Sequence, residues 1–111
     1  MKNIVITQRI EISKYKELRA QLDIRFMNFV AHCGYNPIQV PYFMYEEKKL
    51  KKYLSNWIKK INPEGIVLSG GEDIGKNRIR DFTEFYLLKF AVKKKIPLLG
   101  ICRGMQVIAK H

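Results

Sequence analysis

The sequence predicts an α/β protein with a mostly parallel sheet and helices on both faces. Short β-branched or aliphatic runs alternate with longer segments in which apolar residues recur at three- and four-residue spacing. Glycine-containing turns follow two of the short runs, at Ser69-Gly70-Gly71 and at Gly100-Ile101-Cys102-Arg103-Gly104. Alternating strands and helices form parallel sheets with right-handed crossovers, and ligands gather at the carboxyl ends of such strands.

Each element follows from a local pattern. The expected strands are residues 4–6, 37–41, 65–68 and 96–101, and the prolines that bracket the second suit it to a sheet edge. The expected helices are residues 15–33, residues 46–60, a helix from Asp81 or Thr83 to Val92, and a helix from Cys102 onward. Gly34 is expected to cap the first helix, and residues 72–80 are expected to be loop.

Composition limits the class of protein. Of the 111 residues, 47% are hydrophobic and 12% aromatic, which is ample for a packed core. No apolar run is long enough for a membrane span or a signal-peptide core. Cys33 and Cys102 have neither CxxC spacing nor a neighbouring Cys/His cluster. We therefore expect a cytoplasmic protein with no disulfide, no metal site and no membrane partner.

The second glycine turn has the spacing of a nucleophile elbow, in which small residues flank a nucleophile between a strand and a helix. Cys102 occupies the nucleophile position. The start of the following helix would favour its thiolate through unpaired N–H groups and the helix dipole. The N–H of Arg103, with a second donor from Gly70 or Gly71, would form an oxyanion hole. The alternative is that Cys102 is a buried thiol in a tight turn.

Two other residues are weaker candidates for a site. Cys33 follows the apolar face of the first expected helix, where no glycine turn or strand end would activate it. His32 is expected to be a surface or capping residue at the end of the same helix. We assign no catalytic role to either residue.

Several segments resemble one family. The run from Ile96 to Gln106 closely resembles the nucleophile segment of class I glutamine amidotransferases, above all the γ-glutamyl-γ-aminobutyrate hydrolase (peptidase C26-like) branch. Residues 68–73 resemble the glycine-glycine turn of that branch, and residues 80–84 resemble its Arg-Asp-x-x-Glu helix. Residues 6–9 and 34–41 fit it as well. The resemblance covers nearly the whole chain and implies a flavodoxin-like class I glutamine amidotransferase fold.

The resemblance also implies a reaction. Cys102 would attack the γ-carbonyl of a γ-glutamyl amide to form a thioester while an amine leaves, and water would then release glutamate. The N–H groups of Gly71 and Arg103 would hold the tetrahedral intermediate, and Gln106 would bind substrate. No cofactor is expected. Residues 15–23 faintly resemble relatives that cleave γ-glutamyl nucleotide amidates, which adds a second type of substrate.

In that family, a His and a carboxylate much later in the chain activate the nucleophile. On a continuing helix, His111 would lie roughly 13 Å along the axis from Cys102, beyond a hydrogen-bond reach of about 3 Å. Residues 1–111 are therefore expected to be the N-terminal part of a single domain, with the C-terminal part missing and this chain inactive alone. Otherwise a second copy or a complementing chain supplies the partners. An exposed apolar sheet edge would favour such association.

Two other functions compete with this one. The 21 Lys and Arg against 10 Asp and Glu give a formal net charge of +11, which suggests a basic nucleic-acid-binding domain. Its aromatic residues Tyr53 and Trp57 lie at helical core spacing and no recognition motif is present, so we do not expect a nucleic-acid partner. A catalytically inactive binding or regulatory subunit of the same fold is the stronger alternative, because no base is present.

Overall fold

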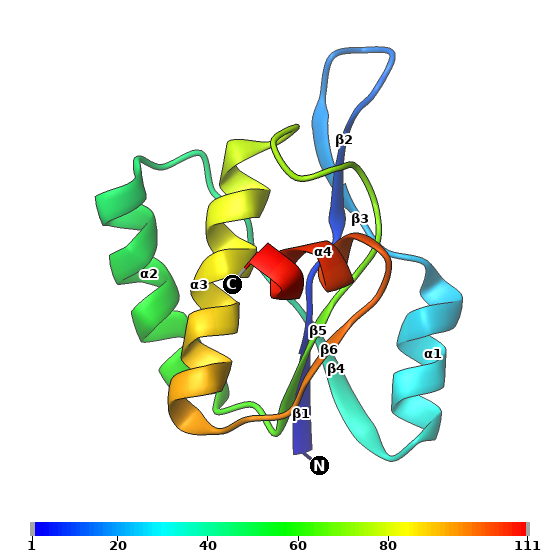
Figure 1. Cartoon of the computed structure of the whole chain (residues 1–111). Helices are drawn as coiled ribbons and strands as arrows, with labels where there is room; N and C mark the ends of the chain where they lie inside the picture. Colours follow the sequence, from blue (N-terminus) through cyan, green and yellow to red (C-terminus); the bar gives the residue numbers. More distant parts are fainter. Residues whose placement is uncertain (1, 111) are drawn as a thin grey trace.

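The computed structural model describes residues 2–110 and contains a four-stranded parallel sheet in the order β4-β1-β5-β6. Helices cover both faces, which confirms the expected fold class, and a small antiparallel hairpin stands apart from the sheet (Figure 1). The sheet strands are β1 (Lys2–Ile6), β4 (Tyr35–Gln39), β5 (Gly65–Leu68) and β6 (Leu98–Gly100). The helices are α1 (Ile24–His32), α2 (Glu47–Ile61), α3 (Arg78–Lys94) and α4 (Arg103–Lys110). The hairpin strands are β2 (Arg9–Ile12) and β3 (Leu18–Gln21).

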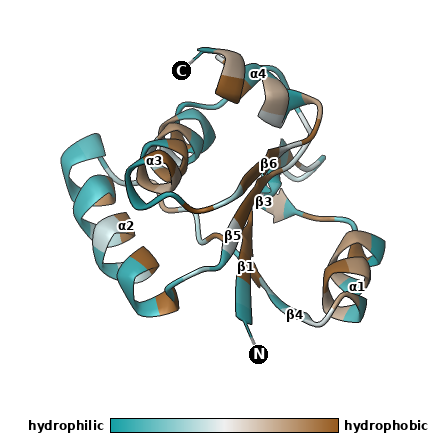
Figure 2. Cartoon of the chain, turned by 60° about the horizontal axis from the view of Figure 1, so that its bottom comes forward, coloured by the Kyte–Doolittle hydropathy of each residue, from teal (hydrophilic) through white to brown (hydrophobic). Residues whose placement is uncertain are grey.

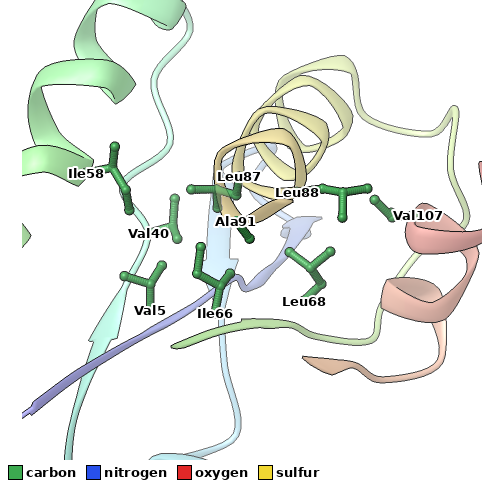
Figure 3. Packing of buried hydrophobic residues seen from close by; sticks show 9 residues of the cluster. All are labelled: Val5, Val40, Ile58, Ile66, Leu68, Leu87, Leu88, Ala91 and Val107. Atoms are coloured by element: carbon green, nitrogen blue, oxygen red, sulfur yellow. The ribbon is translucent and has the colours of Figure 1, made fainter. Parts of the chain in front are cut away.

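The two faces of the sheet receive alternate residues of each strand. On the first face, Val5, Ile66 and Leu68 pack with residues of α2, α3 and α4 (Figure 3). On the second face, Ile6 and Val67 pack with residues of α1. Figure 2 shows these apolar strands at the centre, with the hydrophilic side of α2 facing outward. The β-branched runs of the sequence are therefore central strands that are buried on both sides.

The prolines around the second expected strand mark a sheet edge, as predicted. Pro37 lies within β4, which is an outer strand paired only with β1 among residues 2–110. Proline lacks the N–H group that a central strand donates to its neighbours, so within sheets it is found at the edges. The strand is shifted slightly toward the N-terminus relative to the prediction and ends at Gln39.

The expected helix over residues 15–33 is wrong in its first half. Residues 9–21 form the β2–β3 hairpin, in which Ile12 pairs with Leu18. Its turn is stabilised by the hydroxyl of Ser13, which accepts hydrogen bonds from the N–H groups of Tyr15 at 3.2 Å and Glu17 at 3.1 Å. A serine that bonds to nearby backbone in this way competes with helix formation. The helical spacing of Leu18 was misleading, because this side chain is 49% exposed.

Helix boundaries follow the capping residues. The carboxylate of Asp23 accepts from the N–H of Arg25 at 2.8 Å, so α1 begins after it. Gly34, with φ of 92°, follows the end of α1, in agreement with the predicted glycine stop. Asn77 accepts from the N–H of Arg80 at 2.9 Å and starts α3 earlier than predicted. This first turn was not predicted, because the mostly polar residues before Asp81 do not show the helical spacing of apolar side chains.

The outer strand β6 leaves apolar surface exposed. Among residues 2–110 it pairs only with β5, and Leu99 on it is 57% exposed. This agrees with the expectation of an exposed apolar edge, whereas association through that edge stays a prediction. Within the described residues no helix has the length and apolar character that crossing a membrane requires.

The hairpin turn contains one residue whose substitution should stabilise it. Lys16 has φ of 62°, a conformation that costs a non-glycine residue about 1–2 kcal/mol. Lys16→Gly relieves this cost and should raise the free energy of unfolding by about 0.5 kcal/mol, after the entropy that glycine adds to the unfolded chain. Urea unfolding measures the change. Lys14→Gly, in the same turn but without positive φ, should lower the free energy of unfolding, and equal effects of the two variants would contradict this account.

Candidate active site

The turn between β6 and α4 has the geometry of an elbow. Cys102 has φ of 51°, which is strained for a residue with a side chain, and its side chain is exposed. A Cβ atom on Gly100 would lie 2.6 Å from the carbonyl carbon of Gly104, and one on Gly104 would collide with the carbonyl group of Leu68. Both flanking glycines are therefore sterically required. Cys102 is displayed at the carboxyl edge of the sheet rather than buried.

The glycine turn after β5 lies against this elbow. A Cβ atom placed on Gly70 would be 3.7 Å from the Cβ of Cys102, so the two backbones are close neighbours. Gly71 has φ of 137°, and a Cβ there would collide with the guanidinium of Arg80 and lie 2.8 Å from the Cβ of Arg9. The structure thus brings together the two turns that the sequence singled out.

Backbone donors near Cys102 are available to a ligand. Among the hydrogen bonds of residues 2–110, none is donated by the backbone N–H of Gly70, Gly71 or Arg103. The N–H of Gln106, by contrast, is used within the helix, where it donates to the carbonyl of Cys102 at 3.4 Å. The side chain of Gln106 is exposed one turn after Cys102. Unused donors beside an exposed thiol are the arrangement that an oxyanion would need.

A buried ionic cluster holds the two turns in place. We use this name for Glu72, Arg80, Asp81, Glu84 and Arg103. In it, Arg103 donates to Glu84 at 2.9 Å and to Asp81 at 2.6 Å. Arg80 donates to the carboxylate of Glu72 at 3.1 Å and lies 3.4 Å from that of Glu84. The side chains of Arg80 and Glu84 are 0% exposed and that of Arg103 is 1% exposed.

The cluster reaches the backbone on both sides of the site. The guanidinium of Arg80 donates to the carbonyls of Ser69 at 2.9 Å and Gly70 at 2.8 Å. Thr7, at the end of β1, donates to Glu84 at 2.6 Å and accepts from the N–H of Ser69 at 3.0 Å. The ends of β1 and β5 and the starts of α3 and α4 are therefore joined through one set of charge-assisted hydrogen bonds.

The surroundings of Arg103 favour its guanidinium charge. Burial opposes the charge of Arg103, but the hydrogen bond to Asp81 and the charges of Glu84 and Asp81 outweigh it and raise the pKa of this guanidinium above its ordinary value. Burial also raises the pKa of Tyr42, whose neutral hydroxyl donates to the carbonyl of Gln8 at 2.8 Å. The loop after β1 is thus held by an uncharged phenol.

The side chains that build this cluster were not among the predicted site residues. For Arg103 only the backbone N–H was predicted to act, whereas in the structure its side chain is equally important. Arg80 and Glu84 were noted only as part of a resemblance, and their i,i+4 spacing on a helix was the available signal. Thr7 follows the first predicted strand as a polar residue, and the structure buries it fully. Polar residues of this kind look like surface residues until their partners are known.

The remaining histidine and cysteine residues that were considered for the site are not part of the elbow. His32 is exposed in the last turn of α1, in agreement with the surface or capping position expected for it, and Cys33 is an exposed free thiol at the end of the same helix. His111 lies outside the described residues. Within residues 2–110, no three His, Cys, Asp or Glu side chains are grouped as ligands of a metal ion would be.

A hollow adjoins the two turns on the α1 side of the sheet. Its volume is about 790 Å³, and Ser69, Gly70 and Ile101 form the wall nearest to Cys102. The hairpin and α1 contribute the opposite wall, with a cation at Arg9 and a carboxylate at Asp23. A polar ligand could therefore enter beside Gly70 and contact the hairpin.

The parallel sheet and the cysteine-bearing turn at its carboxyl edge are typical of hydrolases of the glutamine amidotransferase class. A family model described as Peptidase C26 matches residues 4–110. The chain belongs to the Peptidase C26 family.

Three relatives illustrate the range of this similarity. A glutamine amidotransferase-named protein of Schizosaccharomyces pombe is 47% identical over 62 residues, covering 42% of this chain and 24% of the relative. A glutamine-hydrolyzing GMP synthase of Pediococcus pentosaceus is 42% identical over 65 residues, covering 59% and 12%. A gamma-glutamyl-CDP-amidate hydrolase of Campylobacter jejuni is 39% identical over 54 residues, covering 43% and 27%. The match thus spans a small part of each relative's length.

Removing one charge from the ionic cluster should strongly destabilise the protein. In Glu84→Gln, the amide nitrogen must face an existing donor of Arg103, Arg80 or Thr7, which leaves buried groups unsatisfied. We expect the free energy of unfolding to fall by about 3 kcal/mol, measured by urea denaturation. The control is Glu17→Gln, which breaks an exposed pair with Arg19 and should cost less than about 1 kcal/mol. Similar losses in the two variants would contradict a structural role of the cluster.

The close approach of α4 to β5 gives a second test. Gly104→Ala adds a Cβ that collides with Leu68, so the free energy of unfolding should fall by about 2–3 kcal/mol, even though alanine is the better helix former. Gly70→Ala is the matched control, because its Cβ would make only ordinary contacts at 3.7 Å or more. Thermal unfolding followed by circular dichroism compares them. A Gly104→Ala variant as stable as the original chain would exclude the tight contact.

Proposed function

We propose that the protein to which residues 1–111 belong hydrolyses a γ-glutamyl amide, with Cys102 as the nucleophile. The observation that carries this proposal is the position of Cys102. It is exposed, has a positive φ, and lies at the start of α4 against Gly70. This is the arrangement that a nucleophile elbow requires.

The reaction has two steps. The sulfur of Cys102 forms a bond to the γ-carbonyl carbon, the C–N bond breaks, and the amine leaves with a proton. Water then adds to the thioester, the C–S bond breaks, and glutamate and the free thiol are released. The unused N–H groups of Gly71 and Arg103, with Gly70 beside them, would donate to the oxygen that becomes negative in each step. Gln106, on the exposed side of α4, is proposed to contact the substrate.

The ionic cluster supplies rigidity for this chemistry. An oxyanion hole contributes to the rate only if its donors are in place before the reaction, because their reorientation would otherwise cost free energy. Arg80 fixes the carbonyl of Gly70 on one side, and Arg103 carries both a proposed donor N–H and a buried side chain on the other. One network therefore positions both proposed donors.

The base that activates Cys102 is proposed to come from further sequence or from a second chain. His32 and Cys33 lie at the end of α1, and nothing in the structure brings them to the elbow. Two relatives are named for their substrates, glutamine and a γ-glutamyl nucleotide amidate, and a substrate of one of these two types is proposed here. The hollow beside Gly70, of about 790 Å³, has room for a leaving group larger than ammonia.

Selective labelling tests the nucleophile. Cys102 and Cys33 are both exposed, so iodoacetamide should reach both thiols. A glutamine-analogue diazoketone should instead modify Cys102 at least about tenfold faster than Cys33, because the donors beside it stabilise the attacked carbonyl. Peptide mapping by mass spectrometry measures both rates, and excess glutamine should protect Cys102 alone.

Cys33 thus serves as an internal control within the same molecule. Equal labelling of the two thiols by the diazoketone would contradict the proposal and favour a binding or regulatory subunit of the same fold. If glutamine does not slow the labelling of Cys102, Cys102 would still be supported as the nucleophile, but glutamine would be excluded as the substrate.

A further inference from the structure

A groove runs between α2 and α3 on the outer side of the molecule, away from the elbow. Its volume is about 530 Å³. The floor is formed by four aromatic residues of α3: Phe82, Phe85, Tyr86 and Phe90. Their spacing places them on one face of the helix, and all four are half-buried. The two helices lie side by side in Figure 1 and start together, since Arg78 lies 3.9 Å from Glu47.

The opposite face of α3 carries Arg80, Glu84 and the core leucines, which are fully buried. The half-buried aromatic face is therefore distinct from this fully buried one, although Phe85, Tyr86 and Phe90 also contact the core. A helix of a globular protein usually presents polar residues on its outer side. A row of aromatic residues in a groove on that side is the kind of apolar surface that binds a partner.

The rim of the groove is strongly basic. Five lysines line it, and no carboxylate does, although the chain has 10 Asp and Glu residues. These lysines are Lys51 and Lys59 of α2 with Lys89, Lys93 and Lys94 of α3, and all are exposed. A second copy of this chain would bring like charges together there, so self-association through the groove is disfavoured. The charge selects an acidic occupant.

We propose that this groove binds an acidic amphipathic helix of a partner protein. Lys51 and Lys59 both line the groove and are separated along α2 by about two helical turns, roughly 12 Å. A groove of this length accommodates a bound helix with apolar anchors at i, i+3, i+4 and i+7. The anchors contact the aromatic floor while flanking Glu and Asp pair with the lysines. Because the groove follows the outer sides of α2 and α3, its occupant leaves Cys102 accessible, and the proposal is independent of the catalytic one.

The aromatic residues favour a helix over a nucleic acid. Phe85, Tyr86 and Phe90 pack against the hydrophobic core and form the floor of a groove. Single-stranded nucleic acids use aromatic side chains on which successive bases stack, together with a charged track along the backbone. Rings held in the floor between two helices instead form a cleft for compact apolar side chains.

Binding of a synthetic peptide tests the proposal. The probe is a fluorescent peptide of about 15 residues with leucines at i, i+3, i+4 and i+7 and glutamates elsewhere. Its control has the same composition in scrambled order, and fluorescence anisotropy with the 111-residue chain measures both. The patterned peptide should bind at least about tenfold more tightly, since only its apolar face fits the floor. Equal affinities, or no binding of the patterned peptide at about millimolar concentration, would overturn the proposal.

Matched charge reversals locate the site. The double variant Lys51→Glu with Lys93→Glu should weaken binding at least about tenfold. The double variant Lys14→Glu with Lys16→Glu makes the same change in net charge on the hairpin and should have little effect. Phe82→Ala, at the one floor residue outside the hydrophobic core cluster, should also weaken binding without unfolding the chain. Equal losses in both double variants, or tighter binding of an oligothymidylate than of the peptide, would overturn the proposal.

Discussion

The contact between Glu84 and the guanidinium of Arg103 is the interaction on which the rest of this structure depends. Both groups are excluded from water, so neither can be left without its partner. Glu84 lies on α3 and Arg103 starts α4, and Thr7 extends the same contact to the end of β1. The carboxyl edge of the sheet is therefore held by charges whose separation would cost far more than that of a surface pair.

Rigidity at this edge has a geometric consequence for the site. The turn at Gly70 and the elbow at Cys102 follow two paired strands, β5 and β6, and their common attachment to the cluster further fixes their relative position. Sterics limit the alternatives further, because the close approach of Gly104 to Leu68 leaves no room for α4 to shift. Buried ion pairs and close packing therefore both restrict the position of the elbow relative to the Gly70 turn. A strained φ at Cys102 can persist because its surroundings leave it no other arrangement.

The two faces of helix α3 differ in composition. The inner face carries charged and aliphatic residues that are fully buried, and the outer face carries half-buried aromatic residues. The net charge of +11 is also unevenly distributed, because the site cluster holds three carboxylates for two guanidiniums while lysines line the groove beside α2. Much of the basic character belongs to the surface of α2 and α3, where five lysines line the groove.

The sequence by itself determined the succession of sheet strands and helices along the chain, the edge position of the strand at Pro37, and the two glycine turns, whereas the order of the strands within the sheet was not predicted. These features depend on local chemistry: β-branched runs, prolines without an N–H, and glycines where a Cβ would collide. Tertiary structure decided the hairpin over residues 9–21, where backbone pairing and the hydroxyl of Ser13 outweigh a helical pattern. It also decided the ionic cluster, because the partners of Thr7 and Arg103 lie far apart in the chain and a buried charge is recognisable only once its partner is in place.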